Sequence, residues 1–289
     1  MMKILVTGAS GFLGNHVVSD IVKRGHEVIA TCNCPEKAKE YDWYDRVTYI
    51  SQNLANINDD YYTFFGKPDR LIHLAWEGLP NYKSFSHIES NLFWNWQFLR
   101  NIVEHGLNDV TVIGTCLEYG MKNGMLNEDE EPKPTTPYGL AKDSLRRFLE
   151  QLQSAVDFKL KWVRLFYMYG PGQNPKSLLS QLEQALSQDQ EQFNMSRGDQ
   201  IRDYLPVETV ARYIFTIALQ NKITGIVNCC SGKPVTVLDL VNKYLEGRNK
   251  SIKLNLGYYS YPDYEPMEFW GDSSKLNKIL KDNDICLME

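Results

Sequence analysis

The sequence predicts an α/β protein built on a Rossmann-like, doubly wound parallel sheet, and three observations support that prediction. A short apolar run at 3–6 leads directly into a glycine-rich turn, and apolar residues at helical spacing follow until Gly25. Similar short runs recur along the chain and alternate with helical patterns, as in βαβ units. The run at 71–75 is apolar apart from His73, which is typical of a strand buried on both faces of a parallel sheet.

Taken in chain order, the apolar patterns place the remaining elements. Strands are expected at 3–6, 26–31, 47–51, 71–75, 110–115, 158–165 and 225–230. Helices are expected at 12–24, 86–105, 138–154, 208–220 and 237–245, with a short one after Ser273. We assign 1–165 to a dinucleotide-binding domain, to which 206–230 returns, and 166–289 mainly to a small, interleaved substrate-binding domain.

The bulk composition narrows the class of protein and of partner. The chain of 289 residues has a formal net charge of −5 and no run rich in lysine or arginine, so we expect no nucleic acid as partner. No apolar stretch reaches the length of a membrane span, and no cleavable signal precedes the first strand, so no membrane association is expected. The six cysteines show no zinc spacing. A cytoplasmic protein with reduced thiols and no metal is the simplest interpretation.

The turn after the first strand has the features of a pyrophosphate-binding loop. Gly8 allows the tight turn, Gly11 lets the backbone approach a phosphate, and Gly14 lets the helix pack closely on the strand. The helix that follows directs its free N–H groups and the positive end of its dipole at the same place. The residues expected to contact a dinucleotide here are Gly8, Ser10, Gly11, Phe12, Leu13 and Gly14.

A second motif lies on the helix expected at 138–154. Tyr138 and Lys142 are four residues apart and therefore share one face of that helix. A phenol has a pKa of about 10, so it needs help to exchange protons near neutral pH. An ammonium beside it and the positive charge of an oxidised nicotinamide both favour the phenolate.

These motifs resemble those of the short-chain dehydrogenase/reductase superfamily, in its extended, sugar-nucleotide-modifying branch. The resemblance rests on Thr-Gly-x-x-Gly-x-x-Gly at 7–14, Thr-x-x-x-Tyr-Gly at 115–120 and Tyr-x-x-x-Lys at 138–142, and it extends to about Leu280. It implies a homodimer that acts on a nucleoside-diphosphate sugar. It also implies that Thr115, Tyr138 and Lys142 are the catalytic set, with Lys142 bonded to the nicotinamide ribose as well.

The resemblance assigns the remaining cofactor contacts. NAD-binding units carry an acidic residue at the end of the second strand, where this chain has the uncharged Cys32 and Asn33. Because a carboxylate would repel a 2′-phosphate, its absence slightly favours NADP(H) over NAD(H). Asn53 stands where the family has an aspartate that contacts adenine, and its carbonyl oxygen can still accept that hydrogen bond. The other implied contacts are Leu54, Leu74, Ala75, Trp76 and Asn91.

Substrate contacts are expected from segments that leave the carboxyl edge of the sheet. The loop 76–82 is a plausible substrate wall there, although its aromatic residues could equally just pin the loop. Arg202 matches a family diphosphate clamp, with a surface arginine paired to Asp203 as the alternative. His73 is expected to be a hydrogen-bonded core residue. The expected substrate contacts are Glu77, Tyr167, Asn174, Arg202 and Tyr264.

Departures from the family patterns guide the choice of reaction. Dehydratases carry Asp-Glu directly after the catalytic Ser/Thr, where this chain has Cys116 and Leu117, so dehydration is not expected. We expect reduction of a 4-keto group on a nucleoside-diphosphate 6-deoxy sugar, for cell-surface polysaccharide or related sugar biosynthesis. A 4-epimerase is the alternative, disfavoured by Tyr167 in place of the family asparagine and by the missing ribose carboxylate. A non-catalytic cofactor sensor is the alternative from another class, and the intact catalytic set argues against it. We expect Cys116 to be a structural thiol.

Overall fold

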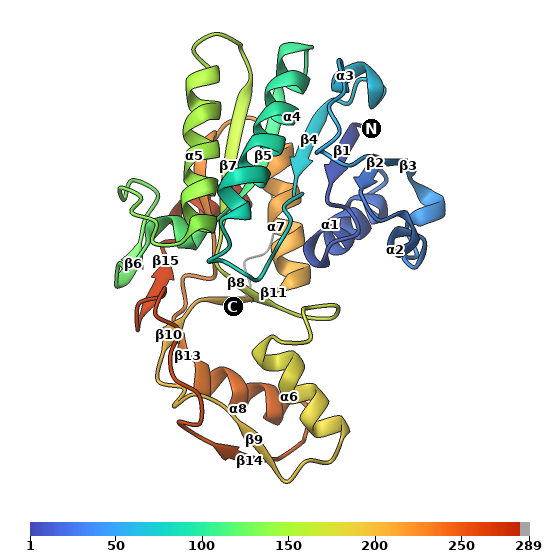
Figure 1. The fold of residues 1–289 in the computed structure, drawn as a ribbon. Coiled ribbons are helices and arrows are strands. Elements are labelled where there is room, and N and C mark those ends of the chain that lie inside the picture. The colour runs from blue at the N-terminus through green and yellow to red at the C-terminus, as the bar shows by residue number, and fades with distance from the viewer. Residues whose placement is uncertain (284–289) are drawn as a thin grey trace.

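A computed structural model describes residues 1–283, and its centre is a parallel sheet of seven strands (Figure 1). The strands are β1 Lys3–Thr7, β2 Glu27–Cys32, β3 Thr48–Ser51, β4 Arg70–His73, β5 Asp109–Thr115, β7 Lys159–Leu165 and β12 Gly225–Cys229. Their order in space is β12-β7-β5-β4-β1-β2-β3. Every strand expected from the sequence is present, so the predicted fold class is confirmed.

The order of the strands reverses next to β1. The chain runs outward from β1 to β3, returns to place β4 on the other side of β1, and then runs outward again to β12. In doubly wound sheets ligands bind outside the carboxyl ends of the strands at such a reversal. The glycine turn directly after β1 therefore lies at the switch point.

Helices cover both faces of the sheet and form two apolar cores (Figure 1). Alternation along β1 shows the division, since Ile4 and Val6 enter one core and Leu5 enters the other. The first core is closed by α1 Phe12–Lys23, α7 Val207–Leu219 and α9 Ser274–Lys281. The second is closed by α3 Tyr61–Phe64, α4 Leu92–Glu104 and α5 Pro137–Leu152. Within residues 1–283 no helix is long and apolar enough to cross a membrane.

Two local features differ from the expectation. The helix expected at 86–105 begins with a wider, π-helical turn, His87–Asn91, before α4 starts at Leu92. Turns of this kind frequently occur at functional sites. Short elements without a long apolar repeat were not expected: α2 Pro35–Lys39, α3, the 3-10 turns Tyr44–Arg46 and Cys116–Tyr119, and the longer α6 Leu178–Ser187.

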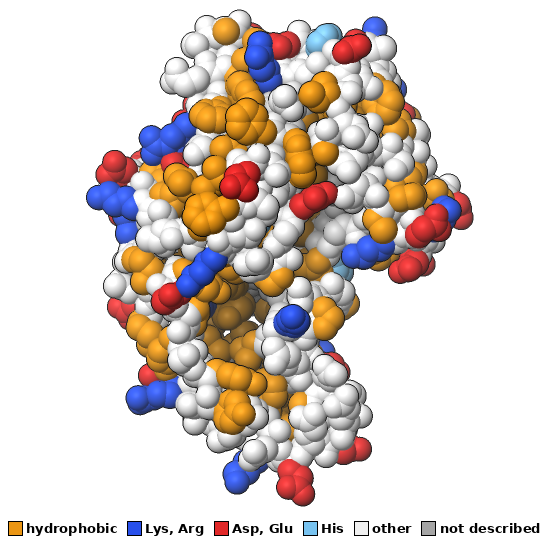
Figure 2. Space-filling model, in the orientation of Figure 1, with side chains coloured by type: hydrophobic (Ala, Val, Ile, Leu, Met, Phe, Trp, Pro, Cys, Tyr) orange, Lys and Arg blue, Asp and Glu red, His pale blue; other side chains and the backbone are white. Residues whose placement is uncertain are grey.

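The C-terminal elements form a smaller lobe below the sheet (Figure 1). Helices α6 and α8 Val237–Gly247 pack on their own apolar core beside β9 Gln192–Asn194 and β14 Lys253–Asn255. Further two-stranded pairs connect the lobe to the sheet: β8 Tyr167–Tyr169 with β11 Tyr204–Pro206, β10 Ile201–Arg202 with β13 Val235–Thr236, and β6 Gly124–Leu126 with β15 Phe269–Gly271. Figure 2 shows the surface hollowed between the two parts, with hydrophobic side chains in the hollow.

Candidate active site

The turn between β1 and α1 is a cradle that side chains would fill. Gly8 has φ of +67°, and a Cβ there would lie 2.8 Å from the backbone nitrogen of Ala75. A Cβ on Gly14 would lie 2.1 Å from the carbonyl oxygen of Gly8. Helix α1 starts after Gly11 with no side-chain cap and no acidic residue in its first turn. Its first N–H groups are thus available to an anion, which is the environment that a dinucleotide pyrophosphate requires.

A cavity of about 300 Å³ extends from this turn along the carboxyl edge of the sheet. Most of the predicted cofactor contacts line it: Gly8, Ser10, Gly11, Cys32, Asn33, Asn53, Leu54, Leu74, Ala75, Trp76 and Asn91. Phe12, Leu13, Gly14 and Lys142 do not. Phe12 packs edge-on against His16, Leu13 packs on the first core, and Gly14 is buried beneath the turn. The structure therefore gathers residues from the ends of four strands at one site of the size of a small-molecule pocket.

Buried hydrogen bonds fix the floor of the cavity. His73 contacts Thr7 Oγ1 through Nδ1 at 2.8 Å and Asn95 Oδ1 through Nε2 at 2.7 Å. Asn95 uses its amide group to donate to the Asn91 carbonyl, so its Oδ1 accepts and the His73 proton lies on Nε2. Burial lowers the pKa of His73 to about 3, which keeps the ring neutral. The prediction of a hydrogen-bonded core histidine is confirmed.

Glu77, which was predicted to contact substrate, lines the cavity that begins at the glycine turn. Its backbone nitrogen donates to Asn91 Oδ1 at 2.9 Å, and its carboxylate accepts from Asn33 Nδ2 at 2.6 Å. The loop after β4 therefore lies between Asn91 in the π-helical turn and Asn33 at the end of β2. Asn91 is thus a support of this loop as well as part of the cavity wall.

Tyr138 and Lys142 lie on the first turns of α5 and are 7% and 2% exposed. Thr136 caps the helix by accepting from Gly139 N at 3.1 Å. Lys142 Nζ donates to the carbonyl of Ile113 at 2.8 Å and lies 3.9 Å from the centre of the Trp76 ring. Burial lowers the pKa of Lys142 to about 7, against the opposing effect of Glu118.

The Tyr138 phenol is enclosed by other rings. Its ring centre is 5.2 Å from that of His87, 5.5 Å from Tyr82 and 6.0 Å from Trp76. Burial raises the pKa of Tyr138, and a hydrogen bond with Thr115 opposes the rise. We expected Lys142 to lower the pKa of Tyr138 toward 7, but burial outweighs any such effect. The Lys142 side chain is directed to the Ile113 carbonyl and to the Trp76 ring. The surroundings hold the phenol in its protonated form.

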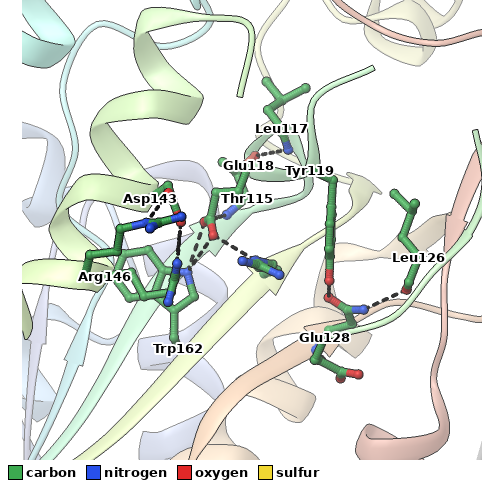
Figure 3. A network of polar contacts seen from close by, with 12 residues as sticks. Thr115, Leu117, Glu118, Tyr119, Leu126, Glu128, Asp143, Arg146 and Trp162 are labelled. Atoms are coloured by element: carbon green, nitrogen blue, oxygen red, sulfur yellow. Dashed lines mark hydrogen bonds and ion pairs between the residues drawn. The ribbon is translucent and has the colours of Figure 1, made fainter. Parts of the chain in front are cut away.

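Thr115 is the last residue of β5, and its backbone nitrogen is bonded to the buried carboxylate of Glu118 (Figure 3). Thr115 N donates to Glu118 Oε1 at 2.9 Å, and Thr115 Oγ1 accepts from Leu117 N at 3.2 Å. Glu118 also accepts from Trp162 Nε1 at 3.0 Å and from Arg164 Nε at 2.7 Å. Both members of the Glu118–Arg164 pair are fully buried. The sequence analysis missed Glu118; the signal was a lone charge in the otherwise uncharged stretch beside Thr115.

Cys116 is a buried thiol in a small apolar cluster. The cluster consists of Cys116, Tyr119, Leu126, Phe166, Cys230 and Phe269. Burial raises the pKa of Cys116, so the reactive thiolate is disfavoured. The burial of Cys116 agrees with the expectation of a structural thiol. The strand ends at Thr115, and Cys116 begins a 3-10 turn.

Two further aromatic residues continue the ring contacts of Tyr138. Tyr82 accepts a hydrogen bond from Tyr138 N through its carbonyl at 3.2 Å, and its ring centre lies 5.7 Å from that of Tyr264. Tyr264, a predicted substrate contact, is thus connected to Tyr138 through Tyr82, which the sequence analysis did not single out. Tyr167 packs on Tyr204 and Phe269. Asn174 lies exposed on the loop before α6, where its side chain accepts from a neighbouring backbone nitrogen.

Arg202 is buried, and its guanidinium already has partners. It forms an ion pair with Glu265 at 3.1 Å and donates to the carbonyls of Ile201 and Met267. The alternative pairing with Asp203 is wrong, because the Asp203 carboxylate accepts from the backbone of 231–232. Binding of a diphosphate by Arg202 stays a prediction.

Comparisons with known proteins identify the family of this chain and several relatives. The model of the NAD dependent epimerase/dehydratase family matches residues 4–230. A dTDP-6-deoxy-L-talose 4-dehydrogenase (NAD(+)) of Aggregatibacter actinomycetemcomitans is 28% identical over 276 residues, covering 93% of this chain and 99% of the relative. A UDP-glucose 4-epimerase of Halalkalibacterium halodurans is 25% identical over 83% of this chain and 78% of its own. Among solved structures, a UDP-glucuronic acid 4-epimerase from Bacillus cereus, in complex with UDP-glucuronic acid and NAD, has a TM-score of 0.82 at 24% identity, with 97% of this chain and 93% of that chain covered.

Proposed function

Because the chain belongs to the NAD dependent epimerase/dehydratase family, we propose that it reduces the 4-keto group of a nucleoside-diphosphate 6-deoxyhexose. The observation that carries the proposal is the buried Tyr138, whose ring packs against Trp76 in the wall of the cavity that begins at the glycine turn. The 4-dehydrogenase relative, which matches over nearly its whole length, supports the same reaction type.

The residues of this chain divide the work of ketone reduction. The nicotinamide of the cofactor supplies the hydride for carbon 4. Tyr138 donates the proton to the carbonyl oxygen, which requires the protonated phenol that its burial favours. Thr115, at the end of β5, would orient the phenol through its hydroxyl group. Lys142, held against Ile113 and Trp76, binds the nicotinamide ribose and supports return of the proton to Tyr138.

Dehydration is disfavoured by the same geometry. Elimination needs an acid and a base beside the sugar, and the two residues after Thr115 are a buried thiol and a leucine. The nearby carboxylate of Glu118 is committed to Thr115 N, Trp162 and Arg164.

A 4-epimerase is the second candidate function. The same Thr115, Tyr138 and Lys142 would serve it, and the UDP-glucose 4-epimerase relative favours it. An epimerase oxidises and re-reduces the same sugar, so it should retain its cofactor through purification, whereas a reductase should exchange it. The cofactor-sensor interpretation gains no support from the relatives.

Several finer assignments belong to this proposal. We take NAD(H) as the cofactor, as in the 4-dehydrogenase relative, in place of the slight preference for NADP(H) that the sequence suggested. The lobe within 166–289 would bind the sugar nucleotide, and 1–165 with 206–230 the cofactor. The homodimer would use the exposed Phe93 and Phe148 on α4 and α5. A cytoplasmic location fits the free thiols of the described cysteines.

The test is oxidation of NADH against a panel of 4-keto-6-deoxyhexoses linked to dTDP, GDP or UDP. We expect loss of absorbance at the reduced-cofactor band with at least one member. If none reacts and UDP-glucose is instead converted to its 4-epimer, the epimerase function replaces the reductase. If neither reaction occurs, both functions are wrong.

A further inference from the structure

We propose that Glu77 makes this protein select NAD over NADP, by supplying from the loop after β4 the carboxylate that the end of β2 lacks. The inference rests on the proposed function in one respect, namely that the glycine-cradle cavity binds a nicotinamide dinucleotide. It reverses the preference expected from the sequence, where only the residues at the end of β2 were considered.

The position of the Glu77 carboxylate carries the inference. Residues at the end of the second strand face the adenosine ribose in dinucleotide-binding units, and here they are Cys32 and Asn33. Glu77 lies 44 positions further along the chain, yet its Oε1 is 2.6 Å from Asn33 Nδ2. Both side chains line the cavity that starts at the glycine turn. A carboxylate is therefore present at the ribose-recognition position, although a different strand provides it.

The structure also holds Glu77 in place from behind. Asn91, which is 3% exposed, accepts from the Glu77 backbone nitrogen at 2.9 Å. The Asn91 carbonyl in turn accepts from Asn95, which is bonded to the buried His73. These contacts connect the Glu77 backbone to buried residues of the sheet. The backbone of Glu77 is therefore fixed, although its side chain is exposed.

Charge then decides between the two cofactors. A carboxylate accepts hydrogen bonds from the ribose hydroxyls of NAD, whereas it repels the 2′-phosphate of NADP at the same place. Lys37 lines the cavity too and would attract that phosphate. Glu77 is bonded directly to Asn33 at the end of β2. Removal of its charge should leave Lys37 to act unopposed.

Dissociation constants of NADH and NADPH, measured by titration calorimetry, test the inference without any sugar substrate. The wild type should bind NADH at least tenfold more tightly than NADPH. Glu77→Gln keeps an oxygen that can accept from Asn33 but loses the charge, so we expect NADPH to bind about tenfold more tightly and NADH to change less than threefold. Glu77→Ala, which loses both, should shift the preference in the same direction. Glu89→Gln, an exposed residue of the following turn outside the cavity, is the matched control and should change neither constant.

The outcomes separate the two proposals. If the wild type binds neither dinucleotide, the proposed function fails and this inference fails with it. If both cofactors bind and the ratio of their constants is unchanged within twofold in Glu77→Gln, the inference is wrong and the proposed function stands. A shift in Glu77→Ala alone would also overturn it, because space rather than charge would then set the preference.

Discussion

Lys142→Met should make the cofactor-free protein more stable at neutral pH while removing its activity. Lys142 is 2% exposed, and its burial lowers the pKa of the ammonium from 10.5 to about 7. The native state thus takes up a proton on Lys142 much less readily than the unfolded chain does. Methionine fills a similar volume and carries no charge. The variant therefore avoids the unfavourable free energy of burying an ammonium group.

The size and the sign of the effect follow from proton linkage. Below pH 7 Lys142 is protonated in both the native and the unfolded state, so the full free-energy cost of burying its charge is present. Between pH 7 and 10.5 only the unfolded state holds the proton, so the free energy of unfolding of the wild type rises with pH. At pH 7 the difference between 10.5 and about 7 corresponds to roughly 4 kcal/mol. Loss of the hydrogen bond to the Ile113 carbonyl costs about 1 kcal/mol, which leaves a net gain of about 3 kcal/mol.

Thermal unfolding of both proteins at pH 7 and pH 9.5 measures this effect. For a chain of 289 residues an entropy of about 2.1 cal/mol/K per residue converts the gain into about 5 °C at pH 7. At pH 9.5 the two midpoints should nearly coincide, because most of the cost has disappeared from the wild type. Lys243→Met, at an exposed position on α8, is the matched control and should follow the wild type at both pH values. A midpoint difference between Lys142→Met and wild type that is the same at pH 7 and 9.5 would refute the reasoning.

Three further predictions concern the residues around Thr115. Tyr138→Phe should lower kcat at least a hundredfold while the NADH dissociation constant changes less than threefold, because the variant loses a proton donor but little contact area. Stopped-flow turnover and calorimetry measure the two quantities, and a variant with wild-type turnover would contradict the prediction. Glu118→Ala leaves Arg164 buried and unpaired, so we expect a loss of about 3 to 5 kcal/mol in the free energy of unfolding by urea. Glu130→Ala, which removes the partly exposed ion pair with Lys122, is the control and should lose less than about 1 kcal/mol. Equal losses in the two variants would be the contrary result. Cys116→Ala should keep reduction within a few-fold of wild type, and in deuterated water the wild type should place no deuterium on the carbons beside the keto group.

The sequence by itself determined the secondary-structure elements and the glycine turn, because local residue patterns encode these features. The seven strands and the helices α1, α5 and α7 follow from apolar spacing, and the glycine turn follows from a run of a few residues. Tyr138 and Lys142 were placed on one face because a helix brings residues four apart together whatever surrounds it. Many residues that line the cavity after β1 could be predicted for the related reason that the carboxyl ends of parallel strands meet at one edge.

Only the tertiary structure decided how side chains from distant segments meet at that edge. Glu77 reaches Asn33 because the loop after β4 extends past β1 to the end of β2, and no local repeat encodes the course of that loop. Glu118 finds its partners on β7, more than forty positions away, and Arg202 pairs with Glu265 rather than with its neighbour Asp203. Charges and hydrogen-bond donors act over a few ångströms in space and not along the chain. The charge at the ribose position and the proton on Tyr138 therefore depend on packing that the order of residues does not display.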